Sequence, residues 1–112
     1  MDRFEMFKIL MAMASADNKF TAGEVEFLAL RSHRWGLTDE QVTEALELAK
    51  TGTTPWAFPE TQQGREKLLQ DLLEVMAADG ELAPVEKKLY AHAAAAMGVS
   101  AEDLNQRLDQ WL

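Results

Sequence analysis

A shift of 62 positions aligns residues 10–42 of this chain with residues 72–104. Seven aligned pairs are identical, and many other pairs combine two residue types that favour the same local backbone conformation or cap. The identical pairs are Leu10/Leu72, Ala16/Ala78, Asp17/Asp79, Glu24/Glu86, Ala29/Ala91, Gly36/Gly98 and Glu40/Glu102. The chain is therefore expected to contain two copies of one structural unit.

The aligned positions predict helix ends at the same places in both copies. Asn18 aligns with Gly80, and these two residue types most readily adopt the left-handed conformation that closes a helix. Gly36 and Gly98 predict the end of a second helix in the same way.

The starts of the third helices are predicted by N-capping residues. Thr38 and Ser100 each follow the preceding glycine by two residues, and their side-chain oxygens can cap a helix. Gln41 and Asp103 then occupy the third helical position, which resembles a capping box. The helices predicted from these signals span about residues 2–16, 21–35, 38–50, 61–78, 84–97 and 100–111.

Apolar side chains recur at helical spacing in every predicted helix, and no alternating pattern long enough for a strand competes with them. The stripes are Phe4, Phe7, Met11 and Ala14; Phe27, Leu28, Leu30 and Trp35; Val42, Ala45, Leu46 and Ala49; Leu68, Leu69, Leu72, Leu73 and Met76; Leu89, Tyr90, Ala93 and Met97; and Leu104, Leu108, Trp111 and Leu112. We expect an all-α compact bundle of about six helices, in which two three-helix repeats are related by a pseudo-twofold axis. The whole chain, 1–112, is expected to be one domain, with repeats at about 2–50 and 61–112 and a connector at 51–60.

The connector carries two aromatic residues, Trp56 and Phe58, between helix-breaking glycine and prolines. Exposed aromatic side chains of this kind can anchor a protein partner, so both are candidate partner-binding residues. The alternative, which we favour, is that they fold back over the seam between the two halves, because exposing them to water is costly.

Each copy also contains an acidic turn in which an Asp and a Glu stand seven residues apart. The four carboxylates are those of Asp17, Glu24, Asp79 and Glu86. An oxygen-only set of this kind suits a divalent cation such as Ca²⁺ or Mg²⁺, although the spacing is not that of an EF-hand. The competing interpretation is capping, because Glu24 completes a capping box with Thr21, and Glu86 follows a proline at the first helical position.

Composition and charge exclude several classes of protein. There is no Cys, so no disulfide or thiolate site is available, and no apolar run is long enough for a transmembrane segment. We therefore expect a cytoplasmic protein. The formal net charge of −8 disfavours nucleic acid, since the only basic cluster is Arg31, His33 and Arg34. Neither His33 nor His92 belongs to a catalytic motif.

The doubled acidic motif resembles the family of the tellurite-resistance protein TerB and the related N-terminal domain of the membrane-anchored DnaJ-like co-chaperone. The matching residues are Ala16-Asp17-Asn18 with Glu24, and Met76-Ala77-Ala78-Asp79-Gly80 with Glu86. Asn18 replaces the glycine that is usual in this motif. The resemblance implies a helical bundle with acidic side chains on one face and a role in stress response or in membrane-linked assemblies, and it brings no established catalysis with it.

The function expected on this basis is that of a TerB-like interaction or scaffold module, whose acidic face binds a basic protein partner or a divalent cation. No cofactor is expected to be required. The alternative is a metal-dependent hydrolase that uses the same carboxylates. A third hypothesis is a structural subunit of a homo-oligomer, with Trp35, Trp56 or Trp111 in the interface.

Overall fold

The computed structural model describes residues 2–16, 21–78 and 84–109, and within these ranges the chain forms helices and connecting segments but no strand. The helices are α1 (Arg3–Ala14), α2 (Ala22–Arg34), α3 (Asp39–Thr51), α4 (Gln62–Met76), α5 (Pro84–Ala96) and α6 (Ala101–Asp109). Their bounds agree with the predicted ones to within about two residues. The all-α bundle predicted from the sequence is thereby confirmed.

Capping residues explain where the helices begin. Thr38 is the N-cap of α3: its hydroxyl accepts from the backbone N–H of Gln41 at 3.1 Å, while the Gln41 side chain accepts from the Thr38 N–H at 3.0 Å. This is the predicted capping box. At the start of α6 the exchange is one-sided, because Ser100 accepts from the Asp103 N–H at 3.2 Å and the Asp103 carboxylate turns to Arg107.

Glycines close the second helix of each half, as predicted. Gly36 and Gly98 have φ values of 68° and 81°, in the left-handed region. The next N–H reaches back over the turn in both cases, from Leu37 to the Ser32 carbonyl at 3.0 Å and from Val99 to the Ala94 carbonyl at 2.9 Å. These are the bonds of a Schellman motif. The helix ends predicted at Asn18 and Gly80 lie outside the described residues.

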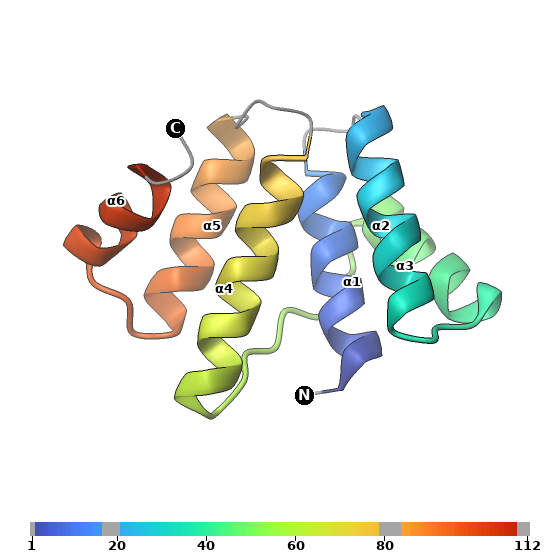
Figure 1. Cartoon of the computed structure of the whole chain (residues 1–112), viewed down its shortest axis with the longest axis horizontal. Helices are drawn as coiled ribbons and strands as arrows, with labels where there is room; N and C mark the ends of the chain where they lie inside the picture. Colours follow the sequence, from blue (N-terminus) through green and yellow to red (C-terminus); the bar gives the residue numbers. More distant parts are fainter. Residues whose placement is uncertain (1, 17–20, 79–83, 110–112) are drawn as a thin grey trace.

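Helices α1 and α4 lie side by side in the middle of the bundle (Figure 1). Seven residues of each are buried, and α1 is apolar around most of the helix, whereas α4 keeps a polar face. A helix that is hydrophobic nearly all round must be covered on several sides. Here α2 and α3 pack on α1, α5 packs on α4, and α6 packs on α5 at the edge of the bundle.

The buried apolar side chains form one cluster that draws on α1 to α5. Phe7, Ile9, Leu68 and Tyr90 are among its fully buried members. Helix α6 contributes only partly buried side chains, Leu104 and Leu108, and Trp111 and Leu112 lie outside the described residues. None of the helices in the described ranges is long and apolar enough to cross a membrane.

One predicted core position is wrong. Leu30 is 66% exposed, whereas Leu28 beside it is buried. The buried residues of α2 are Glu24, Leu28 and Arg31. The charged Arg31 is therefore buried in place of the neighbouring Leu30. The error arises because the inner face of α2 is partly polar.

The element bounds follow the spacing seen in the sequence, since α2 and α5 begin and end 62 residues apart. The third helices are attached differently. Helix α3 packs extensively on α1, whereas α6 packs on α5. The pseudo-twofold relation between the halves and their assignment to a single domain stay predictions.

Candidate functional site

The described residues next to the two acidic turns lie at the same end of the bundle. Helices α1 and α4 end there, and α2 and α5 begin there, at the upper edge of Figure 1. Asp17 and Asp79 lie outside the described residues, so two of the four predicted metal ligands are placed by the structure, Glu24 and Glu86. Each of these is the third residue of its helix.

Glu24 closes the capping box that the sequence predicts for α2. Its Oε1 accepts from the Thr21 backbone N–H at 3.1 Å, and the Thr21 hydroxyl accepts from the Glu24 N–H at 3.1 Å. The side chain is only 1% exposed, although the residue is charged. A carboxylate removed from water in this way requires compensating donors, and the positive end of the helix dipole contributes.

Glu86 occupies the corresponding place in the second half. Helix α5 begins at Pro84, which confirms the prediction of proline at the first helical position. Glu86 is 2% exposed, so it is as deeply buried as Glu24. The chain therefore buries two carboxylates at one end of the bundle, each in the first turn of a helix.

Capping accounts for one oxygen of Glu24, and metal binding stays a prediction. The described residues contain no group of three or more His, Asp or Glu side chains that could hold a metal ion. The predicted four-carboxylate set includes Asp17 and Asp79, which the described ranges leave out.

The connector aromatics lie against the core. Trp56 and Phe58 are half-buried and pack on the hydrophobic cluster, and Pro59 near the end of the connector is buried. Both aromatic side chains line a small depression beside Leu89 and Ala93 of α5. This arrangement agrees with the packing of both aromatic side chains on the core. A role of the two residues in partner binding stays a prediction.

A buried ion pair between α2 and α4 was not predicted. The guanidinium of Arg31 lies 2.8 Å from Asp71 and 2.8 Å from Glu74. Phe27 and Trp35, one turn before and one turn after Arg31, stack on it with ring centres 4.8 and 5.1 Å from the guanidinium carbon. Arg31 therefore contributes no free charge to the basic cluster considered above, and Trp35 is half-buried beside it.

The pKa of Arg31 reflects these partners. Burial acts to lower the pKa, but the hydrogen bonds and charges of Asp71 and Glu74 outweigh burial and raise it. The guanidinium therefore stays charged and links α2 to α4 from inside the bundle. The contact spans 40 residues of sequence, and no local pattern signals it.

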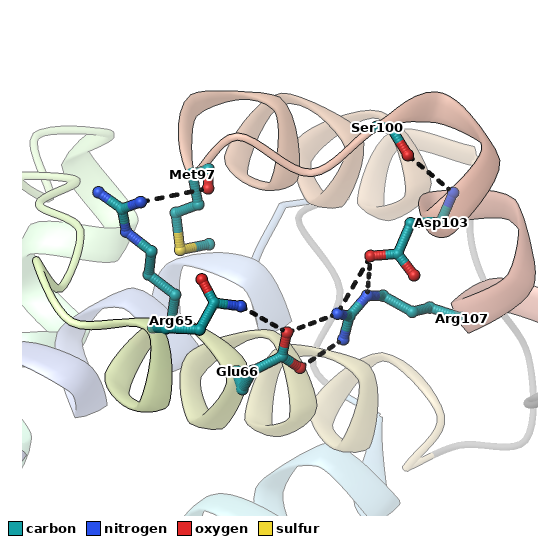
Figure 2. Close-up of polar contacts among 7 residues, drawn as sticks. Arg65, Glu66, Met97, Ser100, Asp103 and Arg107 are labelled. Carbon is teal, nitrogen blue, oxygen red and sulfur yellow. Dashed lines mark hydrogen bonds and ion pairs between the residues drawn. The ribbon is translucent and has the colours of Figure 1, made fainter.

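A second charged cluster attaches α6 to α4 (Figure 2). The guanidinium of Arg107 donates to both carboxylate oxygens of Glu66 at 2.7 and 2.9 Å and to Asp103 at 3.3 Å. The hydrogen bond from Arg107 is the main cause that lowers the pKa of Glu66. The same bond raises the pKa of Arg107.

Tyr90 is a buried residue on which the charges of this cluster act. The side chain is fully buried, and within the described part of the chain its hydroxyl has no hydrogen-bond partner. Burial raises the pKa of Tyr90 to about 12. Removal from water disfavours the phenolate, so Tyr90 acts as an apolar core residue rather than as an acid or base.

Comparison with known proteins adds two findings. The family model of the tellurite resistance protein TerB matches residues 3–108. The chain is also 31% identical to the co-chaperone protein DjlA of Aliivibrio fischeri over 114 aligned positions, which cover 91% of this chain and 40% of that protein. The chain thus spans about two fifths of the length of this relative. No solved structure matches the chain significantly.

Proposed function

The chain belongs to the family of the tellurite resistance protein TerB, and we propose that it is a non-catalytic interaction module of that family. Its acidic face binds a basic protein surface or a divalent cation, Ca²⁺ or Mg²⁺, in a stress response of the kind that the family name describes. The relative with 31% identity is a co-chaperone, which supports a protein partner.

The observation that carries the proposal is the burial of Glu24 and Glu86. Two carboxylates that are 1% and 2% exposed stand at equivalent positions of α2 and α5, at the same end of the bundle. The two carboxylates therefore concentrate negative charge at one end of the bundle. A negative potential there attracts a bound cation or a basic group of a partner.

The oxygen chemistry favours a hard cation over zinc. The predicted set, completed by Asp17 and Asp79, offers carboxylate oxygens from two turns, which are the ligands that Ca²⁺ and Mg²⁺ prefer. Bound ligand would stabilise the folded chain by mass action, since the unfolded chain cannot present the two turns together.

The positions of the histidines support a role without catalysis. His33 and His92 are both exposed and lie on different helices, α2 and α5. A hydrolase built on the four carboxylates would therefore have to use one of them as the general acid or base while the others hold the metal. For this reason the metal-dependent hydrolase is the weaker hypothesis.

Glu24→Gln separates the cation interpretation from capping. Glutamine keeps the oxygen that accepts from Thr21, and Gln41 in this chain makes the same bond to Thr38 at 3.0 Å. The variant should therefore keep α2 intact while losing one ligand charge. We expect Ca²⁺ or Mg²⁺ to raise the melting temperature of the unaltered chain and to raise that of Glu24→Gln much less.

Glu26→Gln is the matched control, because Glu26 is exposed on the same helix. It should leave the cation response unchanged. An equal response in both variants, or none in the unaltered chain, would contradict cation binding and leave capping as the role of Glu24. A cation-dependent hydrolytic activity that Glu24→Gln abolishes would instead support the enzyme hypothesis.

A further inference from the structure

An apolar groove runs between α2 and α3, with α1 as its floor. Its volume is about 380 Å³, and all but two of the side chains that line it are apolar. Phe7 and Met11 form the floor, Val25 and Leu28 form the α2 wall, and Val42 and Leu46 form the α3 wall. Val25 is 52% exposed at the mouth of the groove.

The groove exists because α2 and α3 both pack on α1 more closely than on one another. The corresponding positions of the second half differ. Tyr90 aligns with Leu28 and is a larger side chain that is fully buried, and Lys87 aligns with Val25. The apolar mouth is thus a feature of the first half rather than a consequence of the repeated fold.

The exposed charges of α3, which forms one wall of the groove, are mainly acidic. Helix α3 exposes Asp39, Glu40, Glu44 and Glu47 and has one base, Lys50, at the end of the groove. The helical repeat of about 3.6 residues places Asp39 on the side of α3 that carries Val42 and Leu46, whereas Glu40, Glu44 and Glu47 lie on its outer side. An occupant therefore meets apolar walls, one of which belongs to a helix with four exposed carboxylates and one exposed lysine.

We propose that this groove binds a basic amphipathic helix of a partner protein. Two helices over an apolar floor accept the apolar face of a third helix, whose side chains at i, i+4 and i+7 enter the groove. Lysine or arginine residues on its flanks would then face the carboxylates of α3. The groove residues are distinct from the turn carboxylates, so this inference goes beyond the proposed function and does not depend on cation binding.

Charge argues against the two other obvious occupants. A second copy of the chain carries the same formal charge of −8 and would bring like charges together. An anionic membrane surface would be repelled by the acidic residues of α3. A basic helix is the occupant that satisfies both the apolar groove and the carboxylates beside it.

The probe that tests this inference is a fluorescein-labelled synthetic peptide with leucines at i, i+3, i+4 and i+7 and lysines on the flanks. Binding is measured by fluorescence anisotropy against the intact chain. A second peptide replaces every lysine by glutamate, and a third has the same composition in scrambled order. We expect the lysine peptide to bind, and both others to bind at least about tenfold more weakly.

The variants Val25→Lys and Leu30→Lys form a matched pair. Both residues are exposed and apolar on α2, at 52% and 66%, but only Val25 lines the groove. Val25→Lys places a cation in the mouth of the groove and should weaken binding of the lysine peptide by about tenfold or more. Leu30→Lys adds the same charge elsewhere and should leave binding nearly unchanged. Circular dichroism checks that both variants fold.

Three outcomes would overturn the inference. The first is equal binding of the lysine peptide to the unaltered chain and to Val25→Lys. The second is equal binding of the glutamate or the scrambled peptide. The third is a concentration-dependent dimer in sedimentation, or binding to phosphatidylglycerol vesicles, that Val25→Lys abolishes and Leu30→Lys does not, because either result would identify a different occupant.

Discussion

At the scale of single residues, this bundle places charged side chains where the sequence pattern leads one to expect apolar ones. Arg31 takes an inward position of α2 and is paired with Asp71, which is itself buried on α4. Glu24 and Glu86 are buried in the same way at the starts of α2 and α5. Such groups are stable inside a protein only with partners, so each marks a specific contact.

Tyr90 allows a direct test of burial because it is the only tyrosine of the chain. Its pKa is raised from 10.0 to about 12, mainly by burial. Folding therefore favours the neutral phenol: the resulting stabilisation is fully present below pH 10 and is lost as the pH rises through 12. Its size is on the order of 3 kcal/mol.

Ultraviolet absorbance of the phenolate measures this titration without interference from other tyrosines. We expect a midpoint near 12 in the folded chain and near 10.0 in denaturant. Tyr90→Phe should fold with unchanged or slightly higher stability, since its hydroxyl has no partner among the described residues. A midpoint near 10.0 in the folded chain would show that the hydroxyl reaches water.

The residues of the candidate site were predictable from sequence to different degrees. Glu24 was found because Thr21 and Glu24 form a local pattern three residues apart. Arg31 was read as part of a surface basic cluster, because its partners Asp71 and Glu74 belong to another helix. Burial of a charged side chain depends on tertiary contacts that a single sequence does not reveal.

At the scale of elements, the least firmly held helix is α6. It is nine residues long and contains no buried residue. An isolated helix of this length is unstable in water, so tertiary contacts must hold it. Arg107 supplies one of them by bridging to Glu66 of α4. A shift of 62 positions aligns Arg107 with Ala45 and Glu66 with Phe4 in the first half, where α3 packs directly on α1.

Arg107→Ala should therefore loosen α6 and leave the other helices intact. The ion pair is partly exposed and is worth about 1 kcal/mol, so amide exchange in residues 101–109 should become roughly fivefold faster. Hydrogen exchange measured by NMR gives this quantity residue by residue. Gln106→Ala, an exposed neighbour on α6, is the control and should change little. Equal acceleration in both variants would contradict this role of Arg107.

The helices themselves were well predicted because their boundaries are set locally. Thr38, Gly36 and Gly98 act on the backbone within a few residues, and their caps and turns are those that the sequence indicates. The difference between α3 and α6 was not predicted. It depends on whether a small residue such as Ala45 or a long one such as Arg107 faces the neighbouring helix.

At the scale of the whole molecule, the two halves share a plan and differ in their surfaces. Both bury a glutamate at the same end of the bundle, but the first half carries the apolar groove and the second carries the Arg107 cluster. The 62-residue repeat in the sequence predicts the feature that both halves share, a glutamate in the first turn of α2 and of α5. The groove depends on how α2 and α3 pack on α1, which the sequence does not reveal.

The most direct test is an amide NMR titration of the intact chain with Ca²⁺ and Mg²⁺. If carboxylates of both turns bind one ion together, the amides near Glu24 and near Glu86 shift with a single midpoint and a stoichiometry of one ion per chain. Two unrelated midpoints, shifts at one turn alone, or an unchanged spectrum would contradict a shared acidic site at this end of the bundle.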